Sequence, residues 1–369
     1  MPSRRLFPPL LSLVLLCLIA PGVRGAEWPM AGGDPRHSGV SAERLADKLQ
    51  LAWKFKGRGA FETGAAIAGG TVYAGTMNGR LYALDLGTGR LKWQRLLEGG
   101  VTTIPTVADG RLTVGDNSGN LLCLDAVTSK TLWAFKADAE IHSSPALDQG
   151  RLLFGSYDQH LYCLDAAGGK VKWAFATEGP VHCAPALAGG RAFIAGCDHL
   201  LRAIDTATGR QAWSLEMSSY AAAAPAIFDR TLYVGNFSGE VLAVDINKGQ
   251  FVWRYKPEPE NGFPFYASCA VTAEWVVVGG RDKKVHCLDR QTGARRWVFE
   301  TKGEVDGAAV IAGDRVWVGS KDGSLYGLDL QNGHEIWHYV TGAPLAASPA
   351  VGEGRLVIGD MEGTLYCFK

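Results

Sequence analysis

The chain has 369 residues, of which 47% are hydrophobic and 20% are charged, and its formal net charge at pH 7 is zero. This composition excludes a disordered chain, because enough apolar side chains are present to form a core. Residues 1–26 contain three Arg and no acidic residue, so the remainder carries 34 basic and 37 acidic side chains. That balance excludes nucleic acid as a partner, since binding to phosphates needs an excess of Lys and Arg.

Residues 1–26 have the layout of an export signal. Arg4 and Arg5 precede the apolar run LLSLVLLCLIA, which is too short to span a bilayer stably, and small residues follow it. We therefore expect a signal peptide that is cleaved near Gly25 or Ala26, and a periplasmic or secreted chain. Cys17 follows Leu16 rather than a small residue, which argues against a lipid anchor. No other segment is expected to cross a membrane.

One phrase recurs seven times along the chain, first as ALDLGTGRLKW and last as GLDLQNGHEIW. In each copy an Asp precedes a Trp by eight positions, and the pairs are Asp85 and Trp93, Asp125 and Trp133, Asp165 and Trp173, Asp205 and Trp213, Asp245 and Trp253, Asp289 and Trp297, and Asp329 and Trp337. The Trp residues are forty apart, except that Trp253 and Trp297 are forty-four apart. A fixed period of this length predicts a repeat architecture.

Each repeat has the pattern of four short strands. In residues 141–177 the runs IHSSPAL, RLLFGS, HLYCLD and KVKWAFAT are separated by short polar or glycine-containing turns. In four other repeats the turn between the second and third runs is Asn-Gly, Ser-Gly or Asp-Gly, at Asn78–Gly79, Ser118–Gly119, Ser238–Gly239 and Asp322–Gly323. Such pairs supply the positive φ angles of two-residue hairpins. Four antiparallel strands in about forty residues predict one blade of a β-propeller.

The repeated Asp and Trp residues have structural roles in this interpretation. The Asp ends the third strand, where its carboxylate accepts hydrogen bonds from backbone N–H groups of the next turn. The Trp lies on the outermost strand and covers the neighbouring blade. Seven equivalent carboxylates cannot all be one catalytic acid, so we assign no catalytic residue among them.

The two ends of the sequence predict how the ring closes. The last repeat stops at TLYCFK and lacks its Trp strand, whereas LQLAWKFK at residues 49–56, which contains Trp53, lacks the other three strands. Joining them completes an eighth blade and removes two exposed sheet edges. We therefore predict an all-β fold, in which residues 27–48 are an N-terminal leader and residues 49–369 form an eight-bladed propeller of four-stranded antiparallel blades.

The repeat resembles that of a known family. Its pattern, G-x-(L/V)-(Y/F)-(V/A)-G-(S/T)-x-(D/N)-G-x-L-Y-(A/C)-L-D-x-x-T-G-(K/R)-x-x-W, is similar to the PQQ-type β-propeller repeat of quinoprotein alcohol dehydrogenases and BamB outer-membrane assembly lipoproteins. The resemblance covers residues 49–369, and EWPMAGGDPRHSGVS at residues 27–41 is similar to the leader of exported bacterial PQQ-like repeat proteins. It implies an exported, eight-bladed propeller.

The same resemblance raises the question of a cofactor. Quinoprotein dehydrogenases of the family hold pyrroloquinoline quinone (PQQ) and calcium on the propeller axis, with an adjacent Cys-Cys disulfide, long insertions and a catalytic Asp. This sequence has no adjacent Cys pair, and one repeat alone carries extra residues, four in number. Calcium also needs several convergent oxygen ligands, which the pattern does not supply. We expect no cofactor and no metal site, with PQQ and calcium as the alternative.

Propellers place ligands on the face where the innermost strands begin. Three positions before the Pro-Ala of each first strand, or its equivalent, polar side chains recur at Glu62, His142, His182 and Tyr266. The same register in the other blades is assigned to Thr102, Ala222, Val305 and Ala346. Two interpretations stay open: a small-ligand or metal site made from two His and a Glu, or a hydrated funnel mouth with assorted polar side chains.

Two loops of one blade depart from the repeat. The loop KPEPENGFPFY at residues 256–266 contains the insertion, and its Phe263 and Phe265 predict either a partner-binding protrusion or simple drift in loop length. The basic cluster at residues 281–284 is expected to be a solvated hairpin turn.

The cysteines outside the signal segment do not form a recognisable metal or disulfide pattern. Four of them share one small, buried repeat position: Cys123, Cys163, Cys287 and Cys367. A disulfide between Cys183 and Cys197, across one hairpin, stays open as an alternative.

These patterns predict a non-catalytic scaffold that binds protein partners in the cell envelope, similar in build to BamB and acting in outer-membrane protein assembly. The alternatives are a PQQ-dependent oxidoreductase and a propeller that binds a small ligand in its funnel. We expect a monomer that binds no nucleic acid.

Overall fold

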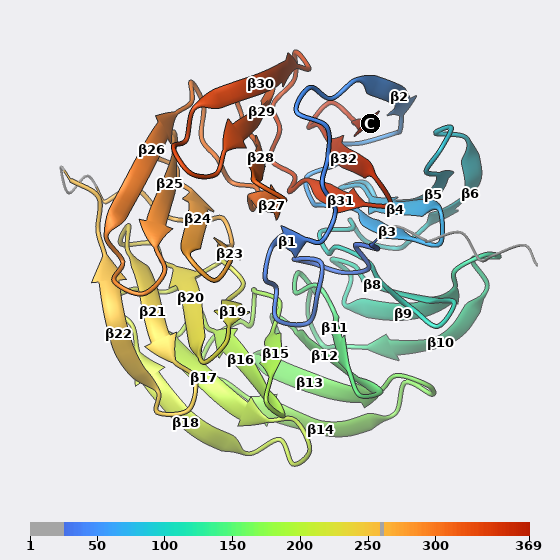
Figure 1. The fold of residues 1–369 in the computed structure, drawn as a ribbon. Coiled ribbons are helices and arrows are strands. Elements are labelled where there is room, and N and C mark those ends of the chain that lie inside the picture. The colour runs from blue at the N-terminus through green and yellow to red at the C-terminus, as the bar shows by residue number, and fades with distance from the viewer. Residues whose placement is uncertain (1–25, 259–261) are drawn as a thin grey trace, which may run out of the picture.

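The computed structural model describes residues 26–258 and 262–369, and these residues form an eight-bladed β-propeller (Figure 1). Every blade is a sheet of four antiparallel strands, and the described residues contain no helix. The predicted fold class is confirmed. The predicted signal peptide, apart from Ala26, lies outside the described residues, among which no helix has the length and apolar character needed to span a bilayer.

The strands of the first four blades follow one another in chain order from the central channel outward. Blades 1 and 2 contain β3 (Ala66–Ala68), β4 (Thr71–Gly75), β5 (Arg80–Asp85) and β6 (Leu91–Leu96), then β7 (Thr106–Ala108), β8 (Arg111–Gly115), β9 (Asn120–Asp125) and β10 (Thr131–Lys136). Blades 3 and 4 contain β11 (Ala146–Asp148), β12 (Arg151–Gly155), β13 (His160–Asp165) and β14 (Val171–Ala176), then β15 (Ala186–Ala188), β16 (Arg191–Ala195), β17 (Leu200–Asp205) and β18 (Gln211–Glu216).

The remaining blades keep this order until the last one. Blades 5 and 6 contain β19 (Ala226–Phe228), β20 (Thr231–Gly235), β21 (Val241–Asp245) and β22 (Gln250–Tyr255), then β23 (Ala270–Val271), β24 (Trp275–Gly279), β25 (Lys284–Asp289) and β26 (Arg295–Glu300). Blade 7 contains β27 (Val310–Ala312), β28 (Arg315–Gly319), β29 (Ser324–Asp329) and β30 (Glu335–Val340), with β1 (Val40–Ser41) parallel to β27. Blade 8 contains β31 (Ala350–Gly352), β32 (Arg355–Gly359), β33 (Thr364–Phe368) and β2 (Leu51–Lys56).

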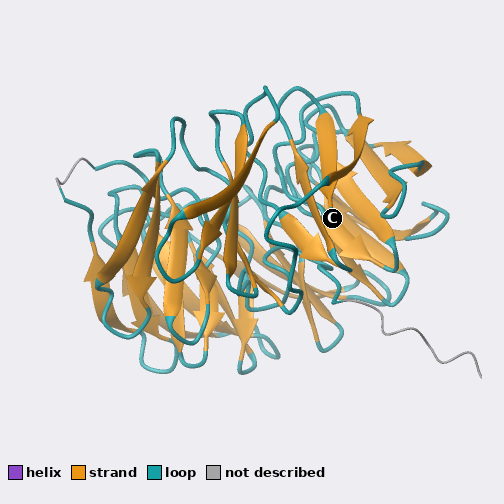
Figure 2. Cartoon of the chain, turned by 45° about the horizontal axis from the view of Figure 1, so that its top comes forward, coloured by secondary structure: helices purple, strands orange, loops and turns teal. Residues whose placement is uncertain are grey.

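Burial within a blade follows from the packing of one blade on the next. The second and third strands of a blade, such as β12 and β13, contain only buried and half-buried residues, because neighbouring blades cover both of their faces. The outermost strand, such as β14, alternates between exposed and half-buried side chains. The turns and loops gather on two opposite faces of the ring (Figure 2).

The repeated Asp organises the turn between the third and fourth strands of each complete repeat. Asp205 Oδ1 accepts hydrogen bonds from the backbone N–H groups of Ala207 and Thr208, at 3.0 and 2.8 Å, and from the Thr208 hydroxyl. The same carboxylate-to-turn bond is present at all seven repeated Asp residues. These contacts are structural, because each carboxylate is used within its own turn.

The repeated Trp joins adjacent blades. Trp173 Nε1 donates a hydrogen bond to the carbonyl oxygen of Thr206, in the turn of the next blade, at 3.0 Å. The equivalent bond is made by Trp53, Trp93, Trp133, Trp213, Trp253 and Trp297. Trp337 instead packs edge-on against Phe368, with the ring centroids 5.6 Å apart.

The ring closes as predicted, by pairing the two ends of the propeller. Strand β2 lies antiparallel to β33, with Trp53 opposite Cys367 and Lys56 opposite Thr364. The backbone of Gln50 also exchanges two hydrogen bonds with Lys369, at 2.9 and 3.0 Å. Blade 8 is therefore built from both ends of the described propeller.

The leader occupies the centre of the ring, which the sequence did not predict. Residues 26–41 cross the channel (Figure 1), and their carbonyl groups accept hydrogen bonds from backbone N–H groups of the innermost strands. The donors in six blades are Ile67, Val107, Leu187, Ile227, Val271 and Ile311. The inner edge of each blade would otherwise present unpaired N–H groups, so the leader satisfies them and closes one end of the channel.

The turns of the leader follow from its Gly and Asp residues. Gly32, Gly33 and Gly39 adopt φ values of 66°, 82° and 68°, in the left-handed region that favours glycine. Asp34 accepts hydrogen bonds from the Arg36 backbone N–H at 2.7 Å and from the Ser38 hydroxyl at 2.6 Å. This compact path lets a short segment contact successive blades around the axis.

A candidate ligand funnel on the propeller axis

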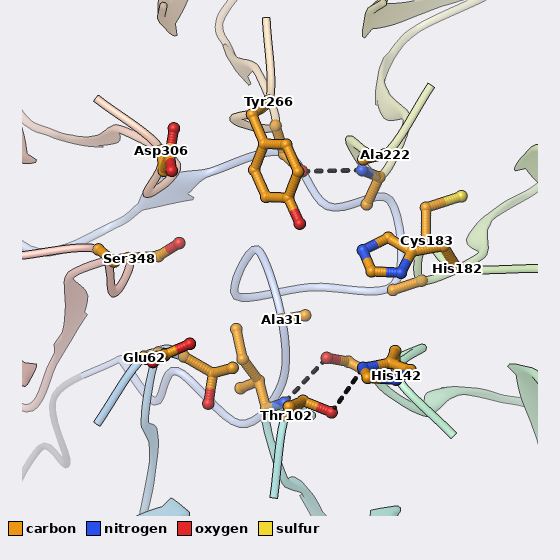
Figure 3. A pocket seen from close by; sticks show the side chains of 18 of the residues that line it. Ala31, Glu62, Thr102, His142, His182, Cys183, Ala222, Tyr266, Asp306 and Ser348 are labelled. Carbon is orange, nitrogen blue, oxygen red and sulfur yellow. Dashed lines mark hydrogen bonds between the residues drawn. The ribbon is translucent and has the colours of Figure 1, made fainter. Parts of the chain in front are cut away.

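A cavity of about 530 Å³ lies on the axis, on the face where the innermost strands begin. Because the leader crosses the channel, Ala31 forms part of its floor, and the cavity is a blind funnel (Figure 3). Its lower wall is made of small side chains, and hydroxyls there join adjacent blades: Ser144 Oγ accepts from the Ile104 N–H at 2.9 Å, and Ser348 Oγ accepts from the Ala308 N–H at 2.9 Å.

Two repeat positions supply the upper wall of the funnel. The first position, just before each inner strand, holds Glu62, Thr102, His142, His182, Ala222, Tyr266, Asp306 and Ala346, all of which line the cavity. The second position, in the turn between the second and third strands, holds Met77, Asn117, Tyr157, Cys197, Phe237, Arg281, Lys321 and Met361. Of these, Met77, Arg281, Lys321 and Met361 line the cavity. Each backbone N–H of the second position donates a hydrogen bond to the carbonyl oxygen of the residue two before the first position, as Met77 does to Ala60. These bonds hold the two sets of residues in a fixed arrangement around the funnel.

One side of the funnel carries a pair of imidazoles. The rings of His142 and His182 are stacked with their centroids 5.6 Å apart, and both point toward the axis (Figure 3). His142 Nδ1 is 3.0 Å from Thr102 Oγ1, and His182 Nδ1 is 2.8 Å from the Tyr157 hydroxyl. Burial lowers the pKa of His142, and burial together with His142 lowers the pKa of His182 to about 4. Both imidazoles are therefore neutral at pH 7.

The adjoining side carries a paired charge cluster. Arg281 donates two hydrogen bonds to the Asp306 carboxylate, at 2.9 and 3.1 Å, and its guanidinium lies 4.5 Å from the centre of the Tyr266 ring. Lys321 Nζ lies 2.7 Å from Asp306 and 2.8 Å from Glu304. Burial raises the pKa of Asp306, but the hydrogen bonds from Arg281 and Lys321 outweigh burial and hold that pKa below its usual value. The charged groups of this cluster are therefore paired with one another.

The four polar residues named from the sequence all reach the cavity, but they do not form one cluster. The ring centroids of His182 and Tyr266 are 6.4 Å apart, while Glu62 stands apart from the imidazole pair (Figure 3). In the described part of the chain, no group of three or more His, Cys, Asp or Glu side chains is arranged to hold a metal ion. The described residues therefore do not assemble the metal site of two His and a Glu.

The sequence register was wrong in blade 7. Val305, which we assigned to the funnel, is fully buried. Its Cγ1 packs on Gly279, where an ideal Cβ would lie 2.2 Å from that atom. Asp306 takes the funnel position instead. Blade 7 has no Pro at the start of its inner strand, so the register had to be counted from Ala309, three positions after Asp306.

The basic cluster at residues 281–284 is not simply a solvated turn. Arg281 faces the funnel and pairs with Asp306, and Asp282 accepts a hydrogen bond from the buried His286 ring at 2.9 Å. The sequence missed Tyr157, Arg281 and Lys321 because only one periodic position was followed. The second position, two residues after the Gly that ends each second strand, would have found them.

Two other expectations are also resolved. Cys183 and Cys197 are free thiols, so no disulfide joins them, and the four cysteines of the small repeat position are free and buried. In the loop at residues 256–266, Phe265 is buried in the core between blades, whereas Phe263 is 49% exposed. Phe265 therefore belongs to the packing of blade 6, and Phe263 alone remains available at the surface.

The chain matches the family model described as outer membrane protein assembly factor BamB over residues 45–144, 117–262 and 256–369. The structure of BamB from Moraxella catarrhalis is similar, with 20% identity, coverage of 87% of this chain and 99% of that chain, and a TM-score of 0.73. Quinohemoprotein alcohol dehydrogenase from Comamonas testosteroni is 15% identical, with 93% and 80% covered and a TM-score of 0.82.

A computationally designed protein, Ika8, is 18% identical, with 86% of this chain and 99% of that chain covered and a TM-score of 0.78. At these identities the three structures show a shared fold and nothing more. A comparison with curated proteins gave no match. The family model covers almost the whole propeller, and with the eight closed blades this places the chain in the BamB family of PQQ-like repeat propellers.

Proposed function

We propose that this protein is a non-catalytic scaffold of the cell envelope that binds partner proteins on its funnel face. The family is described as an outer membrane protein assembly factor, which supports a role in assembling envelope proteins. The export signal predicted from residues 1–26 is consistent with that location.

The observation that carries the proposal is an aromatic rim beside the funnel mouth, made of Tyr220, Phe237 and Phe263. The Tyr220 and Phe237 rings stack with centroids 4.3 Å apart, and the Phe263 carbonyl lies against Gly239 in the hairpin that holds Phe237. Tyr220 is 39% exposed and Phe263 is 49% exposed. Exposed aromatic side chains are typical of protein interfaces, since they bury much area at little cost in entropy.

Site-directed photocrosslinking in the native envelope tests this proposal. A photoreactive residue at Phe263 or Tyr220 should crosslink to the same discrete partner, whereas one at Val127, which is 79% exposed in a turn on the opposite face, should not. The double variant Tyr220→Ser/Phe263→Ser should lose that partner while the protein keeps its thermal stability. Equal crosslinking from Val127, or dye-linked alcohol oxidation when PQQ and Ca²⁺ are added, would contradict a non-catalytic scaffold.

A further inference from the structure

Two imidazoles in the funnel, His142 and His182, each use one ring nitrogen in a hydrogen bond to a neighbouring side chain. These bonds determine whether the other nitrogen donates or accepts. The Thr102 hydroxyl donates to Asn117 Oδ1 at 2.6 Å, so its single hydrogen is used. His142 Nδ1, 3.0 Å from the same oxygen, must therefore be the donor in that contact. A neutral imidazole carries one N–H, and the remaining nitrogen of His142, Nε2, is left as an acceptor.

His182 has the opposite assignment. Its Nδ1 is 2.8 Å from the Tyr157 hydroxyl, and a phenol is a stronger donor than a neutral imidazole, so Tyr157 donates to Nδ1. The proton of His182 then lies on Nε2, which makes that nitrogen a donor. Two stacked rings on one wall thus offer one acceptor and one donor side by side.

Two more groups extend this array across the funnel. The Tyr266 hydroxyl points to the centre of the cavity (Figure 3), where it can donate and accept, and Glu62 adds carboxylate oxygens that accept. In the described part of the chain neither group makes a hydrogen bond or ion pair with another side chain at these atoms. The partly buried cations on the wall, Arg281 and Lys321, are already paired with Asp306 and Glu304.

From this array we propose that the funnel binds a neutral, polyhydroxylated molecule of sugar size. Hydroxyl groups donate and accept at once, so adjacent hydroxyls can pair with His142 Nε2 and His182 Nε2, while an ammonium can only donate and a carboxylate can only accept. An anion would also have to displace Asp306 from Arg281. The cavity of about 530 Å³ falls within the range of roughly 300–1,000 Å³ for small-molecule sites. The ligand is held and not transformed, and the proposal does not depend on the scaffold function.

Calorimetric or NMR titration of the full exported chain tests the proposal. The probes are glucose and trehalose as neutral polyols, with choline as a cationic and citrate as an anionic comparator. We expect saturable binding of at least one sugar, and binding of choline and citrate at least about 10-fold weaker. Stronger binding of either charged probe, or no sugar binding at tens-of-millimolar concentration, overturns the proposal.

Variants then locate the site. His182→Phe keeps a ring in place and removes the donor, so it should weaken sugar binding about 10-fold, as expected for one lost hydrogen bond to a buried group. Tyr157→Phe removes only the hydroxyl that fixes the His182 proton, and should weaken binding by a smaller factor. His338→Phe, on the exposed face of β30, is the matched control and should change nothing. Unchanged affinity in both funnel variants contradicts the proposal. If His182→Phe folds poorly, Tyr157→Phe still tests the site, and unchanged affinity in that variant contradicts the proposal.

Discussion

Six of the eight repeated Trp residues lie against a glycine of the next blade, so two residues from different repeats act as one contact. At Gly249, where φ is 62°, an ideal Cβ would lie 2.7 Å from Cδ2 of Trp213. Six of these Trp–Gly pairs recur around the ring, at Gly89, Gly169, Gly209, Gly249, Gly293 and Gly333. The glycine therefore meets two demands at once: a left-handed backbone and room for an indole.

Gly249→Ala should separate these two demands from each other. The control is Gly190→Ala, because Gly190 has φ of 73° and open space around its Cβ. In the control, the free energy of unfolding should fall only by the cost of a left-handed backbone at Ala, about 1–2 kcal/mol. Gly249→Ala should lose about 1–3 kcal/mol more in the free energy of unfolding, since the indole must shift. Denaturant unfolding measures both, and equal losses would show that the indole contact is unimportant.

His37 of the leader is a buried base. The residue is 3% exposed, and neither ring nitrogen has a hydrogen-bond partner among the residues that the structure describes. Burial lowers its pKa to about 4 despite the opposing effect of Asp34. In the unfolded chain this pKa is near 6.5, so below pH 6.5 the unfolded state takes up a proton that the folded state refuses. Stability is then lost as the pH falls from 6.5 towards 4.

His37→Asn should remove this part of the pH dependence, and Asn tolerates the φ of 53° found there. Between pH 6.5 and pH 4 the free energy of unfolding of the wild type should fall by up to about 3 kcal/mol more than that of the variant. His182 acts in the same direction in both proteins and cancels from the comparison. Parallel pH profiles for the two proteins would rule out His37 as the source.

At the scale of elements, the strands could be predicted from the repeat, whereas the path of the leader could not be predicted. The alternating runs and turn pairs define four strands per repeat, and the Asp and Trp phrases locate the turn that joins the last two. Residues 26–41 have no repeat and no apolar period, and they bind mainly through backbone carbonyls, which every sequence possesses. No side-chain pattern could therefore predict that this segment crosses the channel and closes the funnel.

The repeat likewise determines which funnel residues could be predicted from the sequence. Glu62, His142, His182 and Tyr266 could be predicted because their register is counted from the inner strands, before which five of the eight blades carry a Pro. Asp306 was missed where that Pro is absent, and Arg281 was assigned to solvent because a charged hairpin turn is normally exposed. Arg281 instead pairs with Asp306 across a blade boundary, a contact that periodicity within a repeat does not reveal.

Gly39→Ala should loosen one end of the leader. An ideal Cβ at Gly39 would lie 2.8 Å from the Ala270 Cβ, so the segment there must move. The amides of Val271 and Ile311, which donate to the carbonyls of Ser38 and Gly39, should exchange their hydrogens about 10-fold faster or more. The amide of Val107, bonded to Pro29, is the internal control and should stay protected. Uniform faster exchange would instead indicate global destabilisation.

For the whole molecule, the question is what keeps the ring shut. Seven blades are hairpins of consecutive strands, whereas blade 8 joins residues from opposite ends of the sequence. Ordering β2 against β33 therefore closes a loop of the entire propeller, and the entropy of loop closure rises with the logarithm of its length. The β2–β33 pairing is the contact most expensive to form and the one whose loss opens the ring.

A disulfide across this seam should stabilise the protein more than the same bond inside a blade. Lys56→Cys/Thr364→Cys spans the seam, and Leu96→Cys/Arg80→Cys occupies the equivalent register in blade 1. By the chain-entropy relation, the seam bond should add about 2–3 kcal/mol more, because the loop it closes is far longer. The quantity to compare is the difference in unfolding free energy between the oxidised and reduced forms of each variant. If the two differences are equal, opening of blade 8 does not govern the stability of the ring, and unfolding must begin elsewhere.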